Sequence, residues 1–152
     1  MSLEALHVYA MLAAMRCKFR RARDVISAFT SVDLKEFIVI EWPVGVPYIA
    51  GNCMRLGKMV DGLKRAAFIF HAKVKANLLS LGFEPTLFDC CLFFQFVYDT
   101  DFDIKYLLAL ALLVDNFNII AERKEDVIRF DAEVAKLLDT RIKDPSVMLG
   151  IV

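Results

Sequence analysis

The sequence predicts an α+β fold, an antiparallel sheet with helices packed on one face. Helical segments with apolar residues at three- and four-residue steps alternate with short β-branched and aromatic runs typical of strands. Two apolar runs are separated only by Asp115 and Asn116, and this spacing indicates a tight β-hairpin with Asp115 at its tip. Hairpin-joined strands are antiparallel, so the helices are expected to cover the sheet.

Three segments have helical periodicity. The first is residues 2–19, with Ser2 placed as an N-cap, and the second is residues 61–81, with Gly82 as the stop signal. The third, residues 124–138, alternates apolar and charged positions as a surface helix does. These three segments are the predicted helices.

The predicted strands are short runs rich in β-branched and aromatic residues. The run FIVIEW is closed by a proline, and the run LFFQFVY is followed by the acidic turn DTDFD. The five predicted strands are residues 23–29, 37–42, 92–98, 106–114 and 117–121.

Composition narrows the function classes. The chain has 152 residues, which is one domain, and its 19 basic and 19 acidic residues give a net charge of zero. This balance excludes a strongly basic polyanion binder and an acidic tail protein. Hydrophobic residues make up 58%, against about 45–50% in an average globular domain. The excess predicts an apolar surface that contacts other protein subunits.

The longest apolar run, residues 106–114, has nine residues, whereas a membrane-spanning helix needs about 20, so no membrane span is expected. The four cysteines form no Cys-x-x-Cys pair, which is typical of reduced thiols and predicts an intracellular, reducing compartment. The first 23 residues hold five bases and one acid, and import into an organelle is the alternative that this bias leaves open.

The segment RDVISAFTSVDLKEFIVIEWPVGV resembles the part of copia-type LTR-retrotransposon reverse transcriptases that carries the first catalytic aspartate. That segment has an aspartate and valine, then alanine-phenylalanine, and after a turn an acidic strand ending in a proline-glycine loop. The matching residues are Asp24, Val25, Ala28, Phe29, Leu34, Glu36, Glu41, Pro43 and Gly45.

Further blocks follow in the family's order. The segment RLGKMVDGLKR resembles its Leu-x-Lys-x-x-x-Gly-Leu-Lys segment, and LLVDNFNIIA stands where it has a tyrosine-valine-aspartate-aspartate hairpin. The residues Leu149-Gly150-Ile151 resemble a further short segment of the family. The resemblance implies one reverse-transcriptase palm-like domain over residues 1–152, with truncated fingers and without thumb or RNase H domains.

The resemblance also implies a site for nucleotidyl transfer. In such sites carboxylates hold two Mg²⁺ ions about 3.5–4 Å apart. Asp24 and Asp115 match two carboxylate positions, while Asn116 stands at the third, where the family has aspartate. An amide brings no charge to a hard cation, so metal binding is expected to be weak. No cofactor is therefore expected, and Mg²⁺ would be the metal if the chain were active.

Three functions stay open at this level. The first is an inactive reverse-transcriptase-like subunit of a larger assembly, and the second is an active RNA-directed DNA polymerase fragment using Asp24 and Asp115. The third is RNA or DNA binding without chemistry. Simpler interpretations are an ordinary hairpin turn at Asp115-Asn116 and a solvated helix end for the cations. The candidate phosphate-contacting residues are Arg16, Lys18, Arg20, Arg21, Arg23, Lys64 and Arg65.

Overall fold

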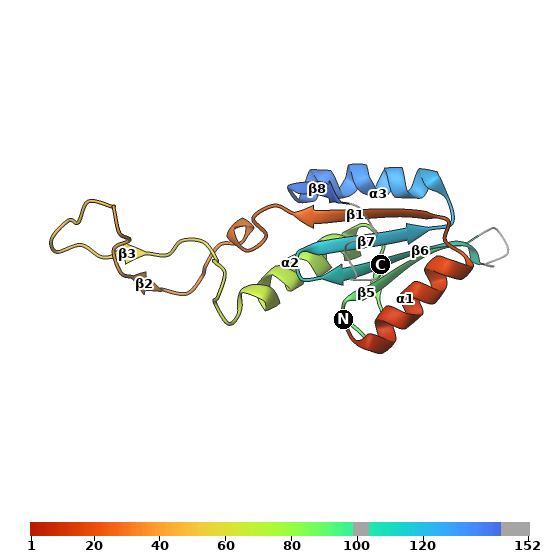
Figure 1. Ribbon diagram of the computed structural model, residues 1–152, viewed down its shortest axis with the longest axis horizontal. Helices are drawn as coiled ribbons and strands as arrows, with labels where there is room; N and C mark the ends of the chain where they lie inside the picture. The colour runs from red at the N-terminus through yellow and green to blue at the C-terminus, as the bar shows by residue number, and fades with distance from the viewer. Residues whose placement is uncertain (99–103, 144–152) are drawn as a thin grey trace. The chain divides into compact units, whose positions relative to one another are not determined.

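The computed structural model describes residues 1–98 and 104–143. Its main element is an antiparallel six-stranded sheet with the strand order β4-β5-β6-β7-β1-β8, so the predicted α+β class is confirmed (Figure 1). The elements are α1 (Leu3–Met15), β1 (Phe19–Val25), the short 3₁₀ helix η1 (Phe29–Ser31), β2 (Val39–Ile40), β3 (Met54–Arg55), α2 (Ala66–Ser80), β4 (Glu84–Pro85), β5 (Leu92–Tyr98), β6 (Ile104–Leu113), β7 (Asn116–Ala121), α3 (Lys124–Leu137) and β8 (Thr140–Lys143).

The chain divides into two compact units. The first contains residues 1–26 and the chain from Val74 onward, and it includes the whole six-stranded sheet. The second contains Ser27–Lys73, with the two-stranded β2–β3 ladder and a small core around Leu34, Met59 and Ala66. The prediction of a single domain is not tested by this division and stays a prediction.

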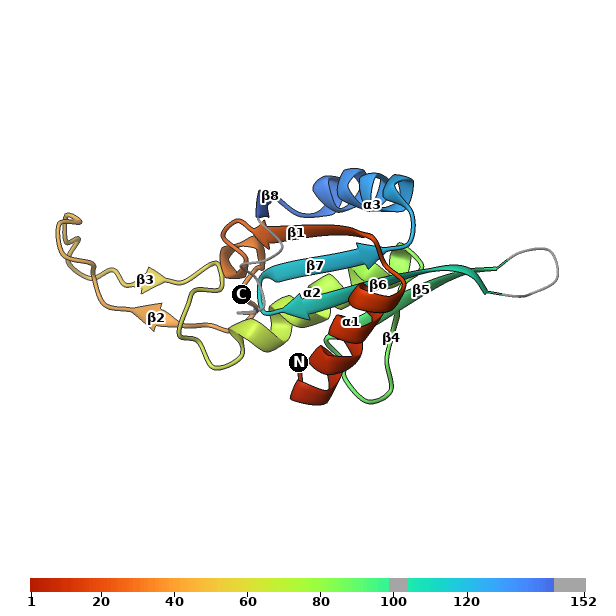
Figure 2. The ribbon, with the colours of Figure 1, turned by 45° about the vertical axis from the view of Figure 1, so that its right-hand side comes forward.

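The two faces of the large sheet carry different helices, because neighbouring residues of a strand point to opposite sides. Ala109 and Ala111 of β6 pack with Tyr9 of α1 in one buried cluster. Leu110 and Leu112 alternate with these alanines and lie on the other face, where Phe117, the partner of Leu112, meets α2 and α3. Figure 2 shows α1 in front of the sheet and α2 behind it. The prediction placed all the helices on one face; α2 and α3 do share a face, whereas α1 lies on the opposite one.

The α1 helix begins where predicted, with Ser2 as its N-cap accepting a hydrogen bond from the Ala5 backbone N–H at 3.2 Å. It ends at Met15, four residues earlier than expected. Its apolar residues surround the helix instead of forming one stripe, so Leu3, Met11 and Met15 remain exposed while Ala5 and Tyr9 are buried.

The first strand is shifted from its prediction. We expected residues 23–29, whereas β1 runs from Phe19 to Val25 and pairs with β7 along most of its length. The strand FRRARDV has few apolar residues, so its pattern resembles a polar connection rather than a buried strand. It ends before Ser27, whose φ of 51° takes the chain out of the extended conformation.

Two other predicted elements are shorter than expected. Of residues 37–42 only Val39–Ile40 form a strand, because the ladder with β3 is only two residue pairs long. The helix predicted from residue 61 begins at Ala66, and Gly62 has a left-handed backbone with a φ of 87° that a right-handed helix excludes. The strands β3, β4 and β8 were not predicted.

The β6–β7 hairpin forms as predicted, but its turn lies one residue earlier. Leu113 pairs with Asn116, so Val114 and Asp115 are the two turn residues and Asn116 is the first residue of β7. The acidic turn at residues 99–103 and the Leu149-Gly150-Ile151 segment lie outside the described residues.

Within the described part of the chain, no helix is both long and apolar enough to cross a membrane. None of the four cysteines forms a disulfide, and Cys17 is buried while Cys53 and Cys90 are exposed.

Candidate functional site

Asp24 lies beside the tip of the β6–β7 hairpin. The antiparallel register of β1 and β7 places Asp24 opposite Asn116. Next to it, the Val25 backbone N–H donates to the Asp115 carbonyl oxygen at 2.8 Å. The three positions that the resemblance assigned to one site are therefore neighbours in space, although they are about 90 residues apart in the chain.

The edge strand β8 brings two cations to the same place. Arg141 pairs with Asp24 and Lys143 pairs with Ala22 across the β1–β8 ladder, so both cations share a face with Asp24. Arg141 Nε donates to Asp24 Oδ2 and Lys143 Nζ donates to Asp24 Oδ1, each at 2.7 Å. Both oxygens of a carboxylate that is only 7% exposed thus accept charge-assisted hydrogen bonds.

The same lysine continues the network into the hairpin. Lys143 Nζ donates to Asn116 Oδ1 at 3.2 Å, and Asn116 Nδ2 donates to Asp115 Oδ1 at 2.8 Å. The amide at position 116 therefore connects a cation to a carboxylate, a role that an aspartate could not perform because it has no donor when ionised. Two carboxylates and two cations leave the cluster without net charge.

The pKa of Asp24 reflects this arrangement. Burial alone raises the pKa of the carboxyl, but the hydrogen bonds and positive charges of Lys143 and Arg141 outweigh burial, so its pKa lies below the ordinary value. Asp24 is therefore an ionised, fully paired carboxylate at neutral pH.

The basic residues expected to contact phosphates are divided between partners and faces. Arg21 and Arg23 both pair with Asp131 of α3, at 3.0 and 2.7 Å, on the face opposite Asp24. Arg16 pairs with Glu122 at 2.8 Å. Three of the five cations are therefore ion-paired, two of them with the same carboxylate. Arg20, Arg21 and Arg23 belong to a strand, so the helix-end interpretation is wrong for them.

Two cations of the cluster keep no ion pair within residues 1–98 and 104–143. They are Lys18 and Arg20, and Arg20 alternates with Ala22 and Asp24 on the α1 face of the sheet. Lys64 and Arg65 belong to the second compact unit, where Arg65 pairs with Glu36 at 2.8 Å on the surface.

Helix α1 is fixed to this face by a buried polar contact that the sequence did not indicate. The Tyr9 hydroxyl donates toward the backbone and side-chain oxygens of Asn118, both at 2.9 Å. Burial, and next the neighbouring Cys17 thiol, raise the pKa of Tyr9 well above its ordinary value. Tyr9 is therefore a neutral donor that holds α1 on β7. Its partner Asn118 lies two residues from Asn116 in the same strand.

Comparison with known proteins decides the family. The sequence model described as reverse transcriptase (RNA-dependent DNA polymerase) matches residues 1–151. The chain belongs to this reverse transcriptase family. It is similar to the retrovirus-related Pol polyprotein from transposon TNT 1-94 of Nicotiana tabacum, with 28% identity over 125 residues. The match covers 81% of this chain and 9% of that polyprotein. The copia-type resemblance is thus confirmed, and no solved structure matches the chain.

The metal chemistry that this reverse transcriptase family implies can be tested against the residues present. Two Mg²⁺ ions require anionic oxygens with lone pairs directed at the metal. Here both Asp24 oxygens and the Asn116 Oδ1 accept hydrogen bonds from cations, and Asn116 contributes no charge. The residues present do not fit a two-metal site, because the place of the metal charges is taken by Arg141 and Lys143.

Arg141 and Lys143 are the members of this cluster that sequence reasoning missed. The run TRIK places cations at alternate positions, which in a strand lie on one face, and this was the only available signal. No apolar alternation marked the run as a strand, and Asp24 lies 117 residues from Arg141 in the chain.

Proposed function

We propose that this reverse-transcriptase-like domain does not catalyse nucleotidyl transfer and serves as a structural, protein-interaction subunit of a larger assembly. One observation carries the first half: Arg141 and Lys143 bind both oxygens of Asp24, the carboxylate at the family's first catalytic position. A metal would have to displace two charge-assisted hydrogen bonds and would find a neutral amide at position 116.

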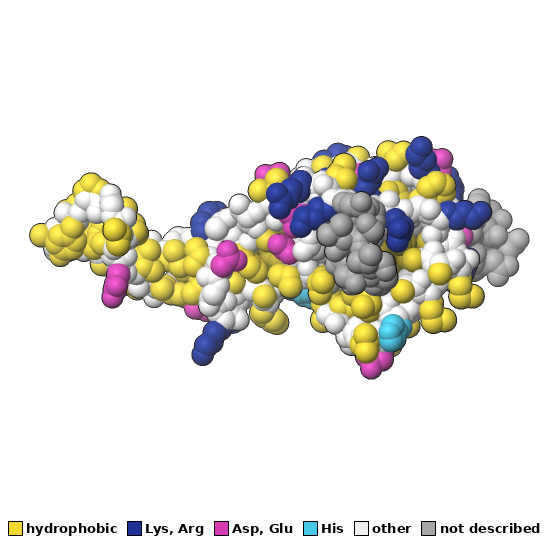
Figure 3. Space-filling model, viewed as in Figure 1, with side chains coloured by type: hydrophobic (Ala, Val, Ile, Leu, Met, Phe, Trp, Pro, Cys, Tyr) yellow, Lys and Arg dark blue, Asp and Glu magenta, His cyan; other side chains and the backbone are white. Residues whose placement is uncertain are grey.

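The interaction half is supported by the apolar surface on the α1 face of the sheet. Met11 and Met15 of α1 are 60% and 77% exposed, and hydrophobic side chains gather over this helix in Figure 3. On the same face, the rings of Phe96 and Tyr98 on β5 lie 6.4 Å apart and are both exposed. Methionine and aromatic side chains are enriched in protein interfaces.

Primer extension on an RNA template with Mg²⁺ tests the loss of chemistry. We expect the wild-type chain and the Asp24→Ala variant to give the same background. Template-dependent synthesis that Asp24→Ala abolishes would show an active RNA-directed DNA polymerase and overturn the proposal. Asp33→Ala, at an exposed carboxylate paired with Lys58, is the matched control for a merely altered charge.

The interaction role is tested by the mass of the purified chain and by its capture of proteins from extract. We expect a specific complex that the Met11→Glu and Met15→Glu double variant loses. A Lys136→Glu variant, on the opposite helix layer, should retain the complex. A monomer that captures the same proteins with and without the α1 changes would contradict the role.

A second candidate is nucleic-acid binding without chemistry, favoured by the cations on the Asp24 face. Arg20 has no ion pair among the described residues, and Arg141 is 66% exposed although it binds Asp24. Salt-titrated binding to RNA and DNA tests it. Under this alternative Arg20→Ala weakens binding while Arg21→Ala, on the opposite face, does not, and no binding at low salt disposes of it.

A further inference from the structure

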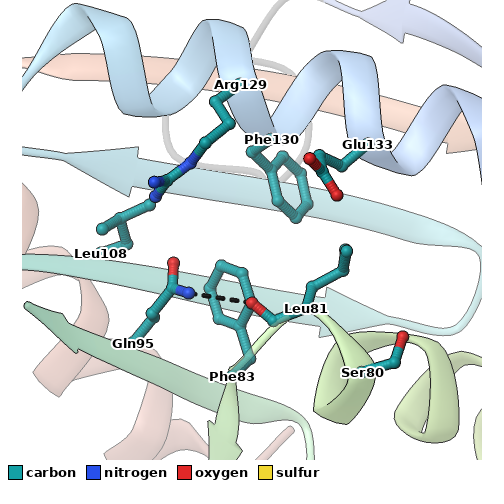
Figure 4. Close-up of a pocket in the computed structure, with 8 residues that line it drawn as sticks. All are labelled: Ser80, Leu81, Phe83, Gln95, Leu108, Arg129, Phe130 and Glu133. Atoms are coloured by element: carbon teal, nitrogen blue, oxygen red, sulfur yellow. Dashed lines mark hydrogen bonds between the residues drawn. The ribbon is translucent and has the colours of Figure 1, made fainter.

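A cavity of about 230 Å³ lies between the end of α2 and helix α3, on the face of the sheet opposite Asp24 (Figure 4). Its apolar walls are the rings of Phe83 and Phe130, which meet edge to face with centroids 5.6 Å apart, and the side chain of Leu108. This volume is below the roughly 300 Å³ of small-molecule pockets, so it suits one side chain.

The polar atoms of the cavity include several acceptors. Gln95 Nε2 donates to the Leu81 carbonyl at 2.8 Å, which fixes the amide and leaves its Oε1 as an acceptor directed away from Leu81 (Figure 4). Ser80 Oγ donates its proton to the Asn77 carbonyl at 2.6 Å, so the same oxygen can only accept from a ligand.

Charge at the rim is unbalanced in favour of a cation. Glu133 makes no ion pair with another residue in the described part of the chain, and its carboxylate lies at the cavity rim. Arg129, one turn earlier on α3, is the cation of the rim, but its NH2 group lies 3.3 Å from Asp126 Oδ1. The buried Asp126 carboxylate also lies 3.8 Å from Arg123 Nε, and Glu125 lies 3.7 Å from the same Nε. Two carboxylates thus face the two arginines, and the Glu133 charge is left uncompensated.

We propose that this cavity binds the guanidinium group of an arginine side chain from a partner polypeptide. A guanidinium has five N–H donors and no acceptor, which complements Gln95 Oε1, Ser80 Oγ and the Glu133 carboxylate. Its planar group and methylene stem pack on aromatic rings such as Phe83 and Phe130. A carboxylate or phosphate ligand would instead meet acceptors and a like charge. The inference names the chemistry of a partner and so rests on the proposed interaction role.

An NMR titration of the full chain with N-acetyl-arginine N-methylamide tests the site. We expect saturable shifts of the Gln95 side-chain amide and of the Leu81 and Phe83 backbone amides. The citrulline analogue has the same shape without the charge, and it should bind about ten-fold or more weakly. Absence of shifts at these groups, or equal binding of the citrulline analogue, would overturn the proposal.

Variants on α3 locate the charge. Glu133→Gln should weaken binding of the arginine derivative about ten-fold, whereas Glu36→Gln, at an exposed glutamate paired with Arg65, should not change it. Arg129→Gln removes the competing cation and should strengthen binding. An unchanged affinity in Glu133→Gln would contradict the assignment.

Agmatine has the same guanidinium group without a peptide backbone. It distinguishes a polypeptide arginine from a small guanidinium compound as the source of the ligand. It should bind no more tightly than the arginine derivative, and tighter binding would overturn the assignment to a polypeptide. The titration is independent of the primer-extension assay and of the α1 variants. An inactive, complex-forming domain that ignores arginine would therefore overturn this inference alone.

Discussion

At the scale of single residues, Asp24 has the surroundings of a structural ion pair. Its carboxylate is buried, and each of its oxygens accepts a hydrogen bond from a cation of β8. Such a carboxylate stabilises the folded state by attaching the edge strand β8 to β1. If Asp24 were a metal ligand, its negative charge would instead be compensated by an ion bound from solution.

Replacing Asp24 with asparagine should therefore reduce stability. The change leaves Arg141 and Lys143 without their anion, and because both reach solvent we expect a loss of about 1–2 kcal/mol in the free energy of unfolding. Urea denaturation measures it. Asp33→Asn, at the exposed Lys58 pair, should leave the urea midpoint almost unchanged, and an equal effect of the two changes would contradict a structural role for Asp24.

Acidification should remove the contribution of Asp24 to the free energy of unfolding. The folded-state pKa of Asp24 is lowered, so protonation costs more free energy in the folded chain than in the unfolded chain. The stability difference between wild type and Asp24→Asn should be constant above about pH 5 and shrink as the pH falls through about 4 toward the lowered pKa. Urea denaturation at a series of pH values measures it, and a difference that grows on acidification would contradict the assignment.

The site residues divide into those that the sequence could predict and those that it could not. The resemblance to the family predicted that Asp24, Asp115 and Asn116 belong to one site, and the structure places them side by side. Arg141 and Lys143 were missed because an edge strand exposed to solvent carries no apolar alternation. The catalytic and metal-binding roles assigned to Asp24, Asp115 and Asn116 stay predictions.

At the scale of elements, the β6–β7 hairpin contains backbone strain. Val114 has a φ of 56°, a conformation that β-branched residues rarely adopt, and among the described non-glycine residues only Ser27 shares a positive φ. Since Asp115 keeps a negative φ, the turn resembles type II′, in which glycine is preferred at the position of Val114.

Val114→Gly should consequently stabilise the domain by about 1 kcal/mol, because glycine adopts this conformation without steric cost. Thermal unfolding would show a raised midpoint. Val44→Gly, at an exposed position with ordinary backbone, is the control and should lower the midpoint slightly or leave it unchanged. A lower midpoint in Val114→Gly than in the wild type would show that the turn is not strained.

The attachment of α1 depends on Tyr9. Tyr9→Phe removes the donor that satisfies the buried oxygens of Asn118, and we expect a loss of about 1–2 kcal/mol in the free energy of unfolding. Urea denaturation measures it, with Tyr48→Phe at an exposed ring as the control. Equal stabilities of the two variants would mean that α1 is held by apolar packing alone.

Element prediction succeeded where apolar periodicity is complete. The strand of residues 92–98 was predicted with its observed bounds, and α3 differs by one residue at its end. It failed at β1, where Arg21 and Arg23 pair with Asp131 of a helix more than 100 residues later. A local pattern cannot contain that partner, so tertiary contacts determine the strand.

At the scale of the whole molecule, the sheet separates two kinds of surface. The α1 face carries the ion-paired carboxylate cluster and the exposed methionines, and the α2–α3 face carries the acceptor-lined cavity. The excess of hydrophobic residues predicted such a surface, but composition could not place it on α1. The proposed contacts with other polypeptides therefore differ in kind: an apolar surface on the α1 face and an arginine-binding cavity on the α2–α3 face.

Binding of Mn²⁺, followed by paramagnetic broadening of the backbone amide signals of residues 25 and 116, tests most directly whether the carboxylate cluster is neutralised by its own cations. We predict no selective broadening of these signals in the wild-type chain. The Asn116→Asp, Arg141→Ala, Lys143→Ala triple variant, with three carboxylates and neither cation, should show it. Selective broadening in the wild-type chain at the same Mn²⁺ concentration would contradict the account.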